Sequence, residues 1–293
     1  MLKNNCTLCK KPISARYYYN DHKKRYYFKN LIKYIFRFKV SIFARKKINY
    51  CEICEFGELS QKPSKDKLSN YYRKQYWKKN IKELDKNQSL NYFLNLRAIS
   101  QRDFIGKKNI NNFSKILDIG AGPSSCCLSL KEYNNQIEIY TIEESNDFDE
   151  YYFKNNINLI SKTFPFISEE NLKFDYIHMS HVLEHFLSLD EVLKNLEQII
   201  KKNGIIFIEV PNCSKEYWLN HVNDEPHIYF FSKKSLLKIF NNDKYDIIKL
   251  EACGESWSNY IKNYLKKNIP IKNIKEVKYN DKGIWLRMLL KKK

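Results

Sequence analysis

Residues 115–122 read KILDIGAG, a short apolar run that ends in an acidic residue and a glycine turn. The apolar residues predict a β-strand over 115–119, and Gly120 and Gly122 let the backbone of the turn come close to a ligand. Pro123 is expected in the first turn of the helix that follows, where a missing N–H costs nothing. Glu143 closes the next predicted strand, 137–142, where a carboxylate can accept both hydroxyls of a ribose.

Two common nucleotide motifs are absent from this turn. Ser125 takes the place of the third glycine of G-x-G-x-x-G, which argues against a dinucleotide. No Lys-Ser or Lys-Thr pair follows the glycines, so a P-loop is excluded. A purely structural glycine turn remains the alternative.

Strand and helix patterns alternate from residue 114 to the end of the chain, which predicts a doubly wound α/β fold with its ligand at the carboxyl ends of the strands. Ser188 and Glu191 form a capping box for a helix that Asn203 and Gly204 are expected to stop. Further strands are expected over 174–179, 205–210, 245–250 and 284–290, and a further helix over 232–240.

We divide the chain into three regions by composition: a basic module (1–66), a helical lead-in (67–110) and the α/β domain (111–293). Of the 52 Lys and Arg, 27 lie in residues 1–110, together with only 8 of the 33 Asp and Glu, so the whole net charge of +19 lies there. Such asymmetry favours contact with phosphates, an anionic membrane surface or an acidic partner. The alternative is a solvated lysine-rich surface.

The basic module contains two C-x-x-C pairs, Cys6 with Cys9 and Cys51 with Cys54. Four thiolates are the ligand set of a tetrahedral Zn²⁺ site, so we expect a structural zinc ion, with free thiols as the alternative. The 41-residue spacer is long, but loop-closure entropy rises slowly with length. The four other cysteines show no ligand spacing and are expected in the core: Cys126, Cys127, Cys213 and Cys253.

At this point ILDIGAG (116–122) resembles the first motif of class I S-adenosylmethionine (SAM)-dependent methyltransferases. Glu143 falls where that family has its ribose-binding acid, FDYIHMSHVLEH (174–185) resembles the family's fourth strand, and NGIIFIEVP (203–211) its fifth. The resemblance implies a Rossmann-like, seven-stranded methyltransferase fold that binds SAM. The resemblance also implies which residues bind the cofactor: Asp118, Gly120, Ala121, Gly122, Glu143, Ser180 and His181. One departure is that residues 160–164 hold no acid for the adenine amino group.

The loop EPHIYFFS (225–232) resembles one in sugar-modifying members of the family, where a histidine is the base. The resemblance implies His227 as general base, oriented by Glu225, with His181 as a second catalytic candidate. Those enzymes have Glu directly before the His, whereas this chain has Pro226. His181, Glu184 and His185 superficially suggest a metal site, but they do not form H-E-x-x-H, and we favour a role in ordering the loop near the cofactor.

The cysteine pairs resemble the zinc-binding module that precedes some sugar methyltransferases, although Lys10 and Glu55 stand where that family has Gly. We therefore expect methylation of a sugar, on a nucleotide-linked or surface-glycan intermediate in polysaccharide biosynthesis. A nucleic-acid methyltransferase is less favoured, because no Asp/Asn-Pro-Pro-Tyr/Phe follows the fourth strand. A SAM-binding protein without turnover is the third alternative.

Nothing in the sequence predicts a membrane span or a signal peptide, so we expect a cytoplasmic protein that can lie against a membrane surface. Residues 29–42 fit either a basic amphipathic helix or, from 36 to 42, a strictly alternating strand, and we favour the strand.

Overall fold

The computed structural model of the chain describes residues 5–18, 46–76, 88–166, 171–215, 226–240, 243–254 and 283–293. Glu225 and the ambiguous segment 29–42 lie outside these residues. Among the described helices, none has the length and apolar character needed to cross a membrane.

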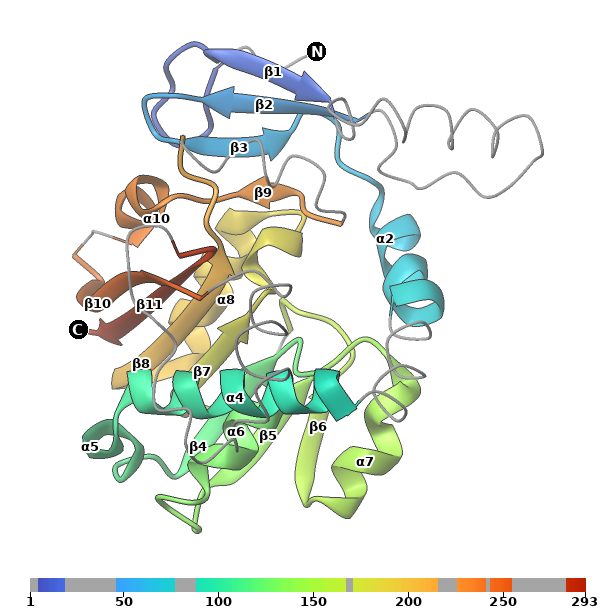
Figure 1. Cartoon of the computed structure of the whole chain (residues 1–293), viewed down its shortest axis with the longest axis vertical. Helices are drawn as coiled ribbons and strands as arrows, with labels where there is room; N and C mark the ends of the chain where they lie inside the picture. Colours follow the sequence, from blue (N-terminus) through green and yellow to red (C-terminus); the bar gives the residue numbers. More distant parts are fainter. Residues whose placement is uncertain are drawn as a thin grey trace.

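A seven-stranded mixed sheet with the order β10-β11-β8-β7-β4-β5-β6 forms the centre of the molecule (Figure 1). The strands from β8 to β6 run parallel, whereas β11 and β10 are antiparallel at one edge. The predicted Rossmann-like α/β fold is confirmed. The strands are β4 (Lys115–Ile119), β5 (Glu138–Ile142), β6 (Ile157–Ser161), β7 (Phe174–Ser180), β8 (Ile200–Pro211), β10 (Tyr245–Cys253) and β11 (Trp285–Lys292).

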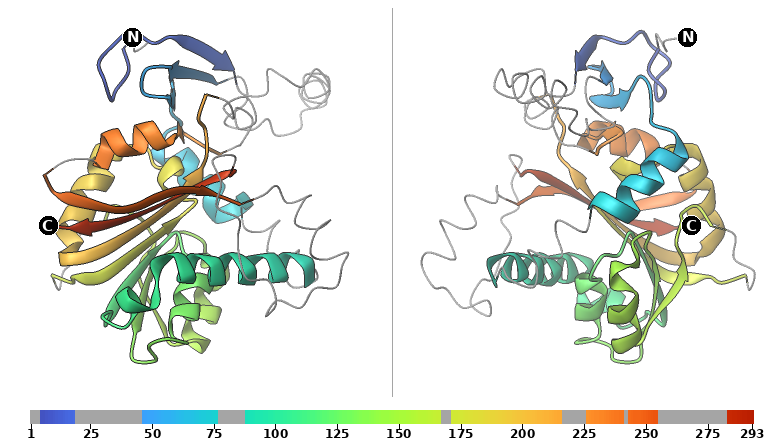
Figure 2. Two further views of the ribbon diagram at one scale, coloured as in Figure 1. Left: turned by 60° about the vertical axis from the view of Figure 1, so that its left-hand side comes forward. Right: turned by 90° about the vertical axis from the view of Figure 1, so that its right-hand side faces the viewer.

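The sheet separates two apolar cores, because successive side chains of a strand point to opposite faces. In β4, Ile116 packs into one core and Leu117 into the other. Figure 2 shows α4, α6 and α7 on one side and α8 and α10 on the other. The helices are α4 (Gln88–Ile105), α5 (Lys107–Ile110), α6 (Ser125–Leu130), α7 (Asp149–Lys154), α8 (Leu189–Ile199) and α10 (Lys233–Phe240), with the short 3₁₀ turns η2 (Asn146–Phe148) and η3 (Leu183–His185).

A second, four-stranded sheet lies at the N-terminal end and has the order β1-β2-β3-β9. Three strands come from the basic module: β1 (Ala15–Tyr18), β2 (Lys47–Cys51) and β3 (Phe56–Leu59). The fourth, β9 (Tyr229–Phe230), comes from the loop after β8, and Gly57 faces Phe230 in the ladder (Figure 1). The loop that contains His227 is therefore joined to the cysteine-bearing sheet.

The lead-in region is helical where it is described, as predicted. Helix α2 (Lys65–Tyr71) continues into the π-helical turn η1 (Tyr72–Tyr76), and α4 follows.

Two predicted boundaries are wrong. Asn203 and Gly204 do not stop α8, because Ile200 is already extended and pairs with Phe174. They instead lie in β8 where its register with β7 shifts between Ile200 and Ile205, with Asn203 at φ 61°. Pro123 precedes α6 rather than opening it, since Ser124 is the N-cap residue. Ser188 does cap α8, and its side chain accepts a hydrogen bond from the Glu191 N–H.

Candidate active site

The glycine turn after β4 brings its backbone close to the start of the segment after β7. Gly120 has φ 66°, and a Cβ there would lie 2.5 Å from Cγ2 of Val182, so only glycine fits. The N–H of Gly122 donates a hydrogen bond of 2.9 Å to Oε2 of Glu143. The turn and the end of β5 are thereby locked together.

Two buried carboxyl groups lie beneath this turn. Glu143 also accepts a hydrogen bond of 2.9 Å from the N–H of Ser145, and burial raises its pKa although the two N–H donors oppose that rise. Asp118 accepts a hydrogen bond of 2.6 Å from the hydroxyl of Ser124. Burial raises the pKa of Asp118 to about 7. Neither carboxyl group has an ion-pair partner among the described residues.

A cavity of about 390 Å³ opens over the strand ends. All the residues that we predict to bind the cofactor line it, from Asp118 to Gly122, then Glu143, Ser180 and His181. Among the described residues after β6, those that line the cavity are Lys162, Thr163, Phe164 and Pro165, and none of them is acidic.

An ion-pair network that the sequence analysis did not identify supports Ser180. The buried carboxylate of Glu209 lies 2.7 Å from Arg97 and 2.5 Å from Arg287. Gln101 donates hydrogen bonds of 2.9 Å to both Ser180 and Glu209. Because Arg97 and Gln101 also line the cavity, the lead-in helix α4 contributes directly to the site.

Three histidines surround the carboxylate of Glu184. Nδ1 of His181 lies 3.4 Å from Oε1 of Glu184, and Nε2 of His185 and of His227 each lie 3.8 Å from it. Burial alone would raise the pKa of Glu184, but the imidazoles lower it to about 2. His181 and His185 line the cavity, whereas His227 lies behind them. Glu225, predicted to orient His227, is outside the described residues.

Aromatic rings cover the same end of the cavity. Tyr72 and Tyr76, from η1, stand with ring centroids 5.4 Å apart in an edge-to-face pair. The ring of Tyr72 lies edge-on to His185 at 6.0 Å. The glycine turn, the Glu143 carboxylate, the two tyrosines and the imidazoles of His181 and His185 therefore line one cavity.

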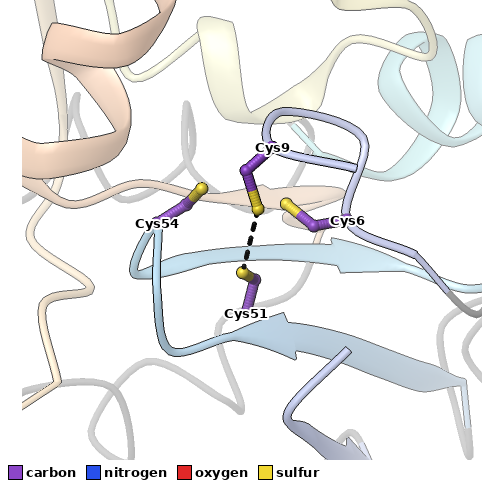
Figure 3. A group of neighbouring side chains, drawn as sticks. All are labelled: Cys6, Cys9, Cys51 and Cys54. Atoms are coloured by element: carbon purple, nitrogen blue, oxygen red, sulfur yellow. Dashed lines mark hydrogen bonds between the residues drawn. The ribbon is translucent and has the colours of Figure 1, made fainter. Parts of the chain in front are cut away.

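The four cysteines predicted to bind zinc come together on the N-terminal sheet (Figure 3). Their sulfur atoms all lie within 4.8 Å of one another, and those of Cys9 and Cys51 are 3.6 Å apart. Lys10 and Glu55, which follow the two pairs, have φ values of 63° and 50°. Such left-handed backbone explains why glycine is usual there. The four other cysteines are buried, as predicted: Cys126, Cys127, Cys213 and Cys253.

The ubiquinone biosynthesis O-methyltransferase of Rickettsia prowazekii (strain Madrid E) is 27% identical to this chain over 165 residues. The match spans 50% of this chain and 65% of that relative, which is just under two thirds of its length.

Two solved structures share the fold. One is a SAM-dependent methyltransferase of Thermotoga maritima, described as a possible histamine N-methyltransferase, with 18% identity and a TM-score of 0.52 over 74% of this chain and 98% of that chain. The other is the plantazolicin methyltransferase BpumL in complex with SAH, with 17% identity and a TM-score of 0.50. The match covers 77% of this chain and 93% of that chain.

The family model of a methyltransferase domain matches residues 71–250, which is more than half of the chain and includes every cavity element from η1 to α8. The chain therefore belongs to the methyltransferase domain family, and it is a SAM-dependent methyltransferase.

Proposed function

We propose that this enzyme transfers the methyl group of SAM to a hydroxyl group of a sugar, carried by a nucleotide or by a glycan intermediate. The observation that carries the proposal is the group of tyrosines and histidines that lines the cavity together with the glycine turn. Tyr72 and Tyr76 offer ring faces for a sugar, and His181 and His185 offer hydrogen-bonding nitrogens beside them.

The donor end of the cavity fits SAM. Each oxygen of Glu143 accepts one backbone hydrogen bond and retains a lone pair, so the carboxylate can also accept the two ribose hydroxyls. The absence of a side chain at Gly120 leaves the backbone open to close approach. Bound SAM supplies a methyl group activated by its sulfonium, so the protein has mainly to position the two reactants.

The hydroxyl oxygen then forms a bond to the methyl carbon, the carbon–sulfur bond breaks with its electron pair passing to sulfur, and the hydroxyl proton passes to an imidazole. The sequence indicates His227 or His181 as the proton acceptor. His181 is supported by its place on the cavity wall, whereas His227 lies behind Glu184 and His185. Removing a general base typically costs about 10²–10⁴ in rate.

A second candidate acceptor is an aromatic hydroxyl. The relative in Rickettsia prowazekii is an O-methyltransferase of ubiquinone biosynthesis, and Tyr72 and Tyr76 would stack on an aromatic ring as well as on a sugar. A glycan is favoured because the cavity rim also contains polar groups suited to several hydroxyls, among them Lys65, Ser69 and Ser188.

The cysteine cluster is proposed to hold one structural Zn²⁺. Zinc–sulfur bonds of about 2.3 Å place tetrahedral sulfurs about 3.8 Å apart, close to the separations in the cluster. The basic N-terminal residues up to 110 are proposed to contact an anionic membrane surface or an acidic partner.

The acceptor is tested by incubating the full-length enzyme with SAM and two panels, nucleotide-linked sugars and catechols, and measuring mass gain by one methyl group. Sugar methylation supports the proposal. Methylation of catechols alone transfers the assignment to the second candidate. His227→Gln and His181→Gln are then compared. The variant that replaces the general base should lose turnover and retain its affinity for SAM.

A further inference from the structure

Glu184, His185 and His227 bring metal-binding atoms together at the wall of the cavity. One ligand atom from each lies within 4.8 Å of the other two, and the two imidazole Nε2 atoms are each 3.8 Å from Oε1 of Glu184. Ligands bound at about 2.1 Å stand roughly 3.0–3.4 Å apart around a single ion. A small inward movement of the side chains therefore completes such a site.

The carboxylate of Glu184 is buried in a way that calls for a ligand. Its side chain is only 1% exposed, and neither oxygen accepts a hydrogen bond from a described residue. An ionised carboxylate taken out of water without hydrogen bonds is costly. Three imidazole nitrogens stand 3.4 to 3.8 Å from Oε1 of Glu184 and offset this cost by their charge, but at distances longer than those of ordinary hydrogen bonds. A cation between them would replace these long contacts with metal–oxygen and metal–nitrogen bonds.

The backbone holds the three ligands in place without help from an ion. Glu184 and His185 lie in the 3₁₀ turn η3, while His227 precedes β9. The N–H of Ile228 donates a hydrogen bond of 2.8 Å to the carbonyl of Glu184, which joins the two segments. The imidazole rings of His185 and His227 have centroids 5.0 Å apart at 51°. The site is thus pre-organised by two segments distant in sequence.

We infer that Glu184, His185 and His227 bind one divalent transition-metal ion, of the Mn²⁺, Fe²⁺ or Zn²⁺ type. Two imidazoles and one carboxylate suit such ions, whereas the soft thiolates of the cysteine cluster form a separate site that favours zinc. His181, 3.4 Å from the same carboxylate, stands beside the site on the cavity wall.

The ion's place gives it a role at the acceptor. His185 lines the cavity, so an ion held by this residue, Glu184 and His227 would stand beside the acceptor, where it would lower the pKa of the acceptor hydroxyl. This role rests on the proposed hydroxyl methylation, but the binding of the ion does not. The inference makes His227 a ligand rather than the proton acceptor and leaves His181 for the proton.

The test uses full-length protein loaded with one equivalent of Zn²⁺ to occupy the cysteine cluster. Mn²⁺ is then titrated, and the free ion is followed by its electron paramagnetic resonance signal. We expect one saturable Mn²⁺ per chain. Glu184→Gln and His185→Gln should each weaken it more than about 100-fold, since losing a group that merely orients a ligand already costs about 10–100-fold. Glu144→Gln, at a cavity acid outside the cluster, should leave Mn²⁺ binding unchanged.

Thermal unfolding of each variant shows that the fold is retained. The inference is overturned if neither Mn²⁺ nor Co²⁺ saturates a site, or if folded Glu184→Gln and His185→Gln bind Mn²⁺ as the unaltered protein does. Mn²⁺ binding without methylation of any hydroxyl compound leaves the site in place and removes the proposed function. Methylation of a sugar by metal-free protein supports the proposed function and overturns the role of the ion at the acceptor.

Discussion

Loss of the proposed zinc ion should loosen the loop that contains His227 as well as the sheet that contains the cysteines. The link is β9, which pairs with β3 of the basic module although it follows β8 in the chain. The perturbation is Cys51→Ser. Structural zinc contributes on the order of 10 kcal/mol to the folding of small domains. Without it, the hairpin of β2 and β3 keeps only its apolar contacts with the main core, through residues such as Ile48, Tyr50 and Phe56.

The effect on the loop follows from the contacts it would lose. The N–H of Leu59 donates a hydrogen bond of 2.9 Å to the carbonyl of Ile228, and Phe230 faces Gly57 in the ladder. The ring of Phe56 stacks on Tyr229 at 5.9 Å. With backbone hydrogen bonds at about 1 kcal/mol each and an aromatic pair at about 0.5–1.5 kcal/mol, the loop loses about 3 kcal/mol. That corresponds to roughly a 100-fold loss of protection.

Hydrogen–deuterium exchange read by mass spectrometry measures this directly. Peptides that cover residues 226–232 should exchange about 100-fold faster in Cys51→Ser, whereas β4 should keep its protection. Cys126→Ser, at a buried cysteine outside the module, is the matched control. If residues 46–59 lost protection while 226–232 kept it, the coupling through β9 would be refuted.

Three further predictions concern the donor end. Glu143→Ala should weaken SAM binding by about 1–3 kcal/mol in calorimetry, through lost ribose hydrogen bonds; tight NADH binding instead would contradict the donor assignment. Gly120→Ala should weaken SAM binding at least about tenfold, because its Cβ would meet Val182 at 2.5 Å, and Val182→Ala should restore part of the loss, an outcome that simple misfolding would not give. The free energy of unfolding of the ligand-free protein should fall as the pH rises from about 4 to about 7. Asp118, with a pKa of about 7 in the folded protein, keeps a proton that the unfolded chain releases near pH 4. Urea unfolding of Asp118→Asn should lack this part of the pH slope; an unchanged slope would place the proton elsewhere.

Strands β4 and β8 were predictable because most of their residues are buried and so read as a nearly continuous apolar run. β4 begins and ends where the pattern predicts, at residues 115 and 119. The error at Asn203 and Gly204 has a physical cause. The same dipeptide that ends helices in a left-handed turn also supplies a positive φ where the register of a strand shifts. Local sequence cannot distinguish these two uses, because the pairing of Ile200 with Phe174 decides between them.

The ion-pair network under Ser180 was not predicted, since its members are far apart in the chain. Arg97 comes from the lead-in helix, Glu209 from β8 and Arg287 from β11. One signal was nevertheless present: Glu209 stands within an otherwise apolar run that is expected to be buried on both faces. A buried charge of this kind needs a cationic partner, so the sequence required an arginine or lysine nearby but could not say which.

Lys10 and Glu55 show how a departure from a family pattern can be misread. Their side chains stand where glycine is usual, which on sequence grounds suggests a cysteine module that no longer binds metal. Yet both adopt the left-handed backbone that glycine would adopt, at φ 63° and 50°. For residues with a Cβ this costs about 1 kcal/mol each. Such strain persists where the surrounding structure fixes the turn, and the N–H of Lys10 indeed closes it on the carbonyl of Cys6 at 2.9 Å. The substitutions therefore leave the geometry that gathers the four thiols intact, and they do not argue against the proposed zinc site.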